Sequence, residues 1–347
     1  MPGYRESPLR DEHEAIKHVV EAVGGLMRDR YATRRPMLRG QHAKAHGTVH
    51  AKVTIAGDLP LELRHGVFKT PRTFDAWVRF SASSMIPMSD ATRDPRGFAL
   101  KLLGVEGEKV LDDPGDNDSQ DFVFVNGQQF FVRDAVDYAE FADCVVRAAT
   151  AKGKLRRLLA TRPFFFPSLW PGAWRWREFW VLWRLTHARD RGPLALRYWS
   201  QTPYKLGPHA IVKYSVTPRV APVAAPEDEL GVAAAVAAGE TVFDLSVQVQ
   251  TDAHRMPEDD PTVRWSERRS PPVKVATIVI PRQTSGDQAR RNFGERLRFT
   301  PWHALADHEP LGSINRVRRA VYLESARMRD EANGIRPRTT EVQPGDR

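Results

Sequence analysis

The stretch PLGSINRVRRAVYLESARMR, residues 310–329, has the pattern of a helix and places Arg318 four residues before Tyr322. On a helix this spacing brings the guanidinium over the phenol ring on one face. A phenol binds a metal ion well only as phenolate. Because its ordinary pKa is about 10, ionisation at neutral pH needs roughly 4 kcal/mol of help. An adjacent arginine and a ferric ion can each supply it. Alone, the pair is more typical of surface packing, so its meaning depends on the rest of the chain.

The composition limits the class of protein. A chain of 347 residues can bury a large core, in one large domain or two smaller ones. The single cysteine, Cys144, lies in the apolar run FADCVV, which predicts a buried, inert thiol and no internal disulfide. The chain starts without an apolar signal segment, and no apolar run is long enough for a membrane-spanning helix. We therefore expect a cytoplasmic location.

Alternation of apolar and polar residues predicts a β-barrel. From His46 onward apolar residues recur at every second position, which is typical of a strand. Similar runs follow, including residues 121–132, and give about eight strands without regular alternation of strands and helices. This predicts an α+β fold with an antiparallel barrel. We expect one domain over residues 1–334, followed by a mobile tail over 335–347. Its expected parts are a helix at 12–29, barrel segments at 46–134 and 206–285, a helical insertion at 135–205, and helices at 286–332.

Three further segments accompany the stretch with Arg318 and Tyr322. They are RGQHAKAHG at 39–47, RDPRGFA at 93–99, and NGQQFFVRD at 126–134. With the RxxxY stretch, in this order, they resemble the haem catalases, in particular short members that keep the haem barrel and lack the appended C-terminal domain. The resemblance runs from about residue 36 to 134, resumes near 205 and ends near 330.

The resemblance implies a haem b centre with a role for each matching residue. Tyr322 matches the proximal iron ligand, and Arg318 matches its charge partner. His42 matches the distal histidine, Asn126 the distal asparagine, and Ser81 the hydroxyl that hydrogen-bonds this histidine. A neutral imidazole can act as both base and acid in O–O cleavage, and a fixed amide can polarise the peroxide.

Other matching residues are expected around the haem. Arg39, Arg79 and Arg329 match the arginines that bind the haem propionates, as suits their forked geometry. Phe141 matches the phenylalanine that stacks on the haem, and Asp94 matches the channel aspartate.

Each of these residues also has a structural interpretation. Taken alone, His42 and Asn126 are more typical of a structural histidine and a turn residue, and Asp94 can form a turn ion pair with Arg96. A zinc site made of His42, His46 and His50 is disfavoured, because Gly47 would break a helix between them.

Gln41 departs from the catalase pattern. Full-length catalases have valine directly before the distal histidine, whereas a side-chain amide here can hydrogen-bond the imidazole or the bound peroxide. In the related allene oxide synthases, a threonine at this position accompanies poor catalase turnover. Ala326 also stands where larger catalases have a histidine. Gln41 favours peroxidase or organic-hydroperoxide chemistry over fast dismutation, and Ala326 indicates a proximal side that is tuned differently.

The positive charge of the chain is local. Residues 147–191 carry the whole net charge of +9, since the remaining basic and acidic residues balance. Within them Trp176, Phe179, Trp180 and Trp183 form a helical stripe. Such a stripe suits peripheral contact of residues 162–191 with an anionic membrane. The alternative, slightly favoured by the sequence, is packing on the barrel or on a second subunit. No nucleic-acid-binding motif is present.

We therefore expect a haem-dependent peroxidase that reduces hydrogen peroxide or organic hydroperoxides, lipid hydroperoxides included, with a small-molecule reductant. A homo-oligomer is expected, with a dimer favoured. One alternative is a hydroperoxide isomerase or lyase that needs no reductant. Another is a haem-binding module without turnover, although the His42/Asn126 pair argues against it because binding alone requires neither residue.

Overall fold

The computed structural model describes residues 8–85, 87, 94–151, 156, 159–187, 192–219 and 230–335. Arg93, parts of the expected helical insertion and tail residues 336–347 lie outside the described residues.

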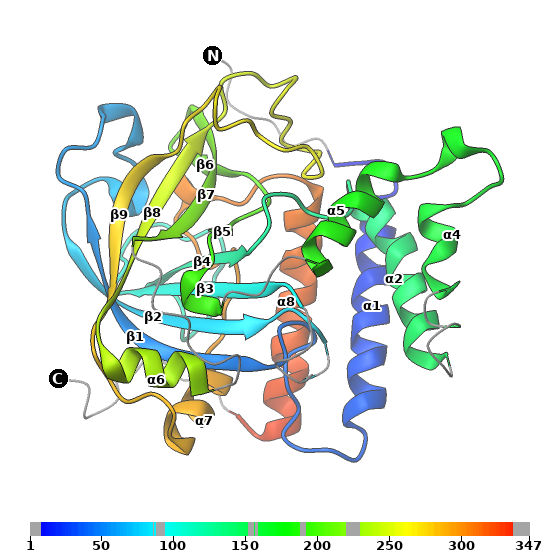
Figure 1. The fold of residues 1–347 in the computed structure, drawn as a ribbon, viewed down its shortest axis with the longest axis horizontal. Coiled ribbons are helices and arrows are strands. Elements are labelled where there is room, and N and C mark those ends of the chain that lie inside the picture. Colours follow the sequence, from blue (N-terminus) through cyan, green and yellow to red (C-terminus); the bar gives the residue numbers. More distant parts are fainter. Residues whose placement is uncertain are drawn as a thin grey trace.

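Eight antiparallel strands close into a barrel, as the alternation predicted (Figure 1). The ring runs β5-β4-β3-β2-β1-β9-β8-β7, and β7 pairs with β5 to close it. A short ninth strand, β6, extends from β7. The strands are β1 Ala45–Ile55, β2 Thr73–Ala82, β3 Arg96–Leu103, β4 Ser119–Val125, β5 Tyr198–Trp199, β6 Tyr204–Leu206, β7 Ala210–Pro218, β8 Thr241–Val249 and β9 Val273–Ile280.

The two faces of β2 lie in different environments. Val78 and Phe80 are fully buried in the hydrophobic interior of the barrel. Because successive side chains of a strand alternate, Arg79 and Ser81 lie on the outer face. They are nevertheless only 3% and 4% exposed. The outer wall of the barrel is therefore covered at this point.

The main helices form a second layer beside the barrel. In Figure 1, α8 stands next to the barrel, followed by α1 and α2. They share a hydrophobic core that is separate from the barrel interior. The α-helices are α1 Glu12–Tyr31, α2 Ala135–Thr150, α4 Arg162–Phe165, α5 Trp176–His187, α6 Leu230–Ala238, α7 Gln288–Arg296 and α8 Ser313–Asn333. Short 3-10 helices are η1 Leu61–Leu63, η2 Gly66–Phe68, η3 Pro171–Ala173, η4 Pro193–Ala195 and η5 Ala306–His308.

Several boundaries refine the sequence prediction. The strand expected over residues 121–132 ends at Val125, and a turn begins at Asn126. Residues 230–238, which are rich in alanine, form α6. Its Val232 and Val236 are buried against the barrel core. Among the described residues, no helix combines the length and apolar character needed to cross a membrane.

Candidate active site

A cavity of about 840 Å³ lies between the outer face of the barrel and α8. One wall consists of alternate residues from β2, β3 and β4, and the opposite wall is one stripe of α8. Its lining includes Arg79, Ser81, Gly97, Ala99 and Val123 from the strands, and Tyr322, Ser325, Ala326 and Arg329 from the helix.

His42 enters this cavity from the segment before β1. Its backbone has φ 54°, a left-handed conformation that non-glycine residues adopt only with support. That support comes from both sides of the residue. Its N–H donates to the carbonyl of Ser83 at 3.2 Å, and its own carbonyl accepts from Nη1 of Arg79 at 3.1 Å. The predicted hydrogen bond between Ser81 Oγ and His42 Nδ1 is present at 3.0 Å.

The surroundings keep the imidazole of His42 uncharged. Burial lowers its pKa to about 3, and the positive charges of Arg79, Arg318 and Arg39 contribute to the same direction. At neutral pH the ring is therefore a free base. Since Ser81 occupies Nδ1, Nε2 is the nitrogen available for proton exchange.

Gly97 makes room for this histidine. It pairs with Ser81 across β2 and β3. A Cβ atom on Gly97 would lie 2.6 Å from Nδ1 of His42 and 2.7 Å from Oγ of Ser81. Asp94 in the same RDPRGFA motif accepts from Oγ of Ser83 at 3.1 Å and from the backbone N–H of Ser84 at 2.8 Å. Gly97 thus leaves space for the imidazole, and Asp94 holds the loop of Ser83 and Ser84, to which the backbone of His42 is hydrogen-bonded.

Asn126 lies close to this site in the sheet but faces a different space. Its Oδ1 accepts from the backbone N–H of Arg96 at 2.8 Å, and its own N–H donates to the carbonyl of Arg96 at 3.0 Å. It lines a second cavity of about 850 Å³ next to α5 and is not among the residues that line the cavity of His42. The structure therefore does not bring Asn126 and His42 into one cavity, and a joint role stays a prediction.

Arg318 and Tyr322 lie on one face of α8, as the spacing predicted. The guanidinium carbon is 5.6 Å from the centre of the Tyr322 ring. Arg318 also donates to Oγ1 of Thr202 and Oδ1 of Asn315, each at 3.0 Å. Burial lowers the pKa of Arg318, but the oxygens of Tyr322 and Tyr204, which it hydrogen-bonds, outweigh this and raise it. The guanidinium is therefore a fixed positive charge beside the phenol.

Three predicted propionate-binding arginines meet at one end of the cavity, together with a glutamate that was not predicted. Arg39 and Arg79 bind the carboxylate of Glu295 at 2.6 and 3.0 Å. Arg329 is 3.4 Å from Asp330. Burial raises the pKa of Glu295, but the charges of Arg39 and Arg79 overcome this and lower it.

Two donors of this arginine cluster have no partner within the described part of the chain. They are Nε of Arg79 and Nη2 of Arg329, and both atoms are buried. A buried guanidinium donor without an acceptor is costly, so each position favours an incoming anionic oxygen. The cluster therefore fits the carboxylates of a haem, even with Glu295 in place.

Gln41 and Phe141 differ from their predicted contacts. Nε2 of Gln41 donates to the hydroxyl of Tyr138 at 2.9 Å, so this amide hydrogen is not directed at the imidazole. Phe141 packs between Phe131 and Phe164 in the helical core and does not line the cavity. This placement does not support stacking of Phe141 on a haem in the cavity.

Tyr138 is the residue of α2 that sequence reasoning missed. It lies one turn before Phe141 on the same helix, and burial raises the pKa of its hydroxyl. Helical spacing alone places both residues on one side of α2. It does not tell which of the two contacts Gln41. The unusual Gln41 was the available signal, because a buried amide needs a hydrogen-bonding partner.

The three histidines with metal-like spacing do not converge. Nε2 of His46 is bonded to Nη1 of Arg96 at 2.8 Å, and Nε2 of His50 lies 3.2 Å from Asp75. The zinc site disfavoured by the sequence is therefore not formed.

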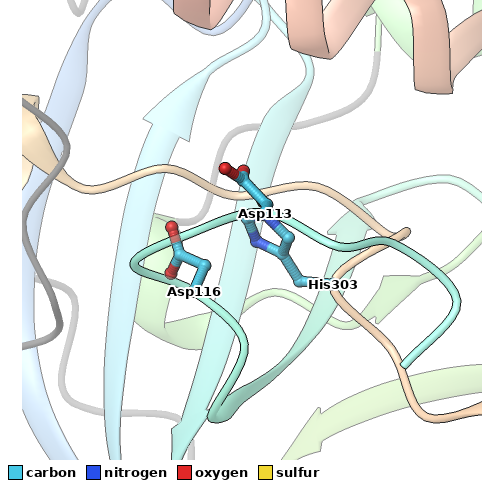
Figure 2. A group of neighbouring side chains, drawn as sticks. All are labelled: Asp113, Asp116 and His303. Atoms are coloured by element: carbon cyan, nitrogen blue, oxygen red, sulfur yellow. The ribbon is translucent and has the colours of Figure 1, made fainter. Parts of the chain in front are cut away.

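A second charged group, not foreseen from the sequence, contributes Asp113 and His303 to the cavity wall. Asp113 and Asp116 come from the loop between β3 and β4, whereas His303 precedes α8 (Figure 2). His303 bonds Asp113 through Nε2 at 2.9 Å and Asp121 through Nδ1 at 3.0 Å. Nζ of the buried Lys101 lies 2.6 Å from Asp116 and 2.9 Å from Asp121. The ammonium group of Lys101 thus pairs with two of these carboxylates, and we interpret the group as an ion-pair network.

The protonation of His303 follows from this network. Burial and Lys101 lower the pKa of His303, but its hydrogen bonds to Asp113 and Asp121 outweigh them and raise it. Two bound carboxylates stabilise the imidazolium. The network therefore favours the protonated form of His303 beside the ammonium group of Lys101.

Comparisons with known proteins find catalases. The family model described as catalase matches residues 20–165. A catalase of Streptomyces coelicolor is 30% identical over 126 residues, which is 36% of this chain but only 23% of that protein. The structure of a bacterial catalase aligns with a TM-score of 0.64 at 17% identity, covering 100% of this chain and 67% of that one. The crystal structure of a fungal catalase aligns with a TM-score of 0.61 at 16% identity, covering 92% and 66%.

The chain is thus similar to catalases over part of its sequence and has the fold of the solved catalases. It corresponds to about two thirds of the length of these solved catalases.

Proposed function

We propose that the protein is a haem-dependent peroxidase that reduces hydrogen peroxide and organic hydroperoxides. The observation that carries the proposal is that Tyr322, beside the fixed charge of Arg318, lines the same cavity as the neutral imidazole of His42. A phenol stabilised by a cation is a suitable ligand for ferric iron, and a neutral imidazole is a suitable base.

The residues that would hold the haem are Tyr322 at the iron and Arg39, Arg79 and Arg329 at the propionates. The partnerless donors of Arg79 and Arg329 support this assignment. When bound, the haem supplies the redox-active iron at which a peroxide O–O bond is cleaved.

His42 moves the proton in this proposal. Nε2 accepts the proton of the hydroperoxide and returns it to the oxygen that departs, while Ser81 at Nδ1 fixes the ring. Over the whole reaction ROOH takes two electrons and two protons and gives ROH and water. The electrons come from a small-molecule reductant. An imidazole that stays unprotonated at neutral pH can begin each cycle without first losing a proton.

Weak dismutation of hydrogen peroxide is part of the proposal. Gln41, directly before His42 and hydrogen-bonded to Tyr138, stands at the position where full-length catalases have valine. Polar groups here can hold or redirect peroxide oxygens and so favour a reductant-dependent cycle.

The test is reconstitution of the purified protein with haem, followed by peroxide. We expect a Soret band that is displaced in Tyr322→Phe, and a peroxide-induced spectral change that is lost in His42→Ala. His18→Ala is the matched control, since this histidine is half exposed on α1 and bonds Asp143. A protein that takes up no haem would refute the proposal.

Products separate the remaining chemistries. Consumption of an organic hydroperoxide only when a reductant is present supports a peroxidase. Rearrangement without a reductant would indicate the isomerase or lyase alternative. A Soret band that never responds to peroxide would indicate a module that only binds haem. The predicted homodimer and cytoplasmic location stay predictions.

A further inference from the structure

An exposed aromatic surface lies on and beside α5, away from the candidate active site. Its members are large apolar side chains with much of their surface in contact with solvent. We call them the tryptophan face: Leu169, Trp170, Trp176, Trp180 and Trp183, which are 93%, 74%, 44%, 48% and 44% exposed. Figure 1 shows the segment between α4 and α5 extending beyond the helices on the side away from the barrel. Exposed apolar groups gathered in this way mark an interaction site.

The opposite side of α5 explains why these tryptophans face outward. Val181 and Leu185 are buried, and Phe179 packs against Phe165 and Phe166. Glu178 is also buried and bonds Arg133 at 3.3 Å. The helix is therefore anchored through its inner face, which fixes the tryptophans on the outer one. Packing of the whole stripe on the barrel, one of the two alternatives from the sequence, does not occur.

The exposed rings pack mainly on one another. Trp180 and Trp183 meet edge to face at 5.5 Å, and Trp183 stacks on His187 at 4.9 Å. Trp174 and Trp176 are 4.9 Å apart. Tryptophan side chains, with an apolar ring body and a polar N–H, are typical of the membrane–water boundary.

The charge around the tryptophan face is positive. Arg162, Arg177 and Arg184 are exposed on α4 and α5. Arg177 pairs with Asp260 at 3.0 Å. For Arg162 and Arg184 the described residues supply no carboxylate partner. The acidic Glu178 of this segment is buried and already paired, so it does not offset them.

We propose that the tryptophan face and its arginines dock the protein peripherally on an anionic lipid bilayer. Aromatic rings enter the headgroup boundary while arginines bind anionic headgroups. A second copy of the chain fits less well. In a twofold dimer the same patch meets itself, so the arginines of both copies would face each other.

The docking helix packs against the turn that follows Asn126, the residue that the family resemblance assigns as the distal asparagine. Leu185, on the inner side of α5, contacts Gly127 so closely that a Cβ there would overlap it. The same helix lines the cavity that contains Asn126. Because docking would hold the protein at a bilayer surface, we assign lipid hydroperoxides of the bound membrane as the substrate class. This assignment rests on the proposed peroxidase function, whereas the docking itself does not.

The first experiment is sedimentation of the full-length protein with vesicles of phosphatidylglycerol and phosphatidylcholine, and with vesicles of phosphatidylcholine alone. We expect binding to the anionic vesicles that weakens with salt. Replacing Trp176, Trp180 and Trp183 together by Gln should weaken binding on the order of 100-fold, because each ring retains about half of its surface to bury. Arg162→Gln should weaken it about fivefold.

Matched controls lie elsewhere on the surface. Leu61→Gln removes a side chain that is 77% exposed in η1, and Arg255→Gln removes a charge that is 63% exposed. Both should bind as the unmodified protein does, and circular dichroism should show every variant folded. No binding to anionic vesicles at low salt, or equal binding by the triple variant, would overturn the proposal. So would sedimentation velocity showing a dimer that the triple variant loses.

The second experiment separates docking from chemistry. With a reductant, the haem-loaded protein should reduce a phospholipid hydroperoxide in anionic vesicles and tert-butyl hydroperoxide in solution. The triple variant should lose only the first activity. Equal loss of both would refute the substrate assignment. Vesicle binding without either activity would refute the peroxidase function and leave docking supported.

Discussion

Replacing Gly97 by Ala tests whether the position of His42 governs peroxide chemistry. The added methyl would lie 2.6 Å from Nδ1 and 2.7 Å from Cε1 of His42, and 2.7 Å from Oγ of Ser81. Ordinary non-bonded contacts between such atoms are about 3.5 Å or longer. The imidazole and its serine partner must therefore move by roughly 1 Å, or the strands must separate.

The cost falls mainly on reactivity. A displacement of about 1 Å of a proton-transfer group lowers rates by about 100-fold. Overpacking also lowers the free energy of unfolding, by about 1–3 kcal/mol. Haem uptake should persist, because Tyr322 and the arginine cluster are not displaced. Stopped-flow mixing of the haem-loaded protein with peroxide measures the rate, and urea unfolding measures the stability.

Gly25→Ala is the matched control for this substitution. Gly25 lies within α1, and a Cβ there meets no atom within 4 Å. Since alanine favours a helix over glycine by about 0.5–1 kcal/mol, this variant should be slightly more stable and react normally. A Gly97→Ala protein that reacts with peroxide as fast as Gly25→Ala would refute the inferred role of the imidazole position.

Three further predictions concern buried polar contacts. Gln41→Leu leaves the Tyr138 hydroxyl without its donor and should lower the free energy of unfolding, measured in urea, by about 1–3 kcal/mol. Adding Tyr138→Phe should restore most of this stability. A double variant that recovers none of it would contradict the pairing. Glu295→Gln should lower the free energy of unfolding of the haem-free protein by about 3 kcal/mol, because Arg39 loses its carboxylate partner. In the same urea assay, haem should restore part of this stability, since a propionate can take the place of the Glu295 carboxylate. His303→Gln should also cost about 3 kcal/mol near pH 6. Because the folded pKa of His303 is raised, its contribution is complete below its unfolded pKa and disappears as pH rises through the folded value. The difference between variant and parent, measured by unfolding at a series of pH values, should therefore shrink at high pH; a growing difference would show that the imidazolium is not the stabilising form.

The sequence predicted the parts of the protein that depend on local patterns. Alternation identified the strands of the barrel, and the spacing of Arg318 and Tyr322 placed both on one face of α8. The contact between His42 and Ser81 was also predicted, although only through the family resemblance. Periodicity and motif order are properties of the chain itself, so they can be read without knowing how distant segments pack.

Other features depend on contacts between distant segments. Glu295 reaches Arg39 across 256 positions, and no local pattern marks it as the partner. His303 reaches Asp113 across 190 positions for the same reason. Asn126 was assigned by its motif, yet its direction depends on where β4 ends. These features follow from tertiary packing and could not be predicted from spacing.

The stripe of α8 that lines the cavity has a consequence for how this protein can change over time. From Val321 to Arg329 it advances by eight positions, a rise of roughly 12 Å along the helix axis. Exchanging one side chain on the stripe alters one contact. Inserting or deleting one residue after Tyr322 would rotate Arg329 by about 100° and take it away from the cavity. The number of residues between Tyr322 and Arg329 therefore fixes which side chains reach the cavity. We expect this number to tolerate less change than the side chains themselves.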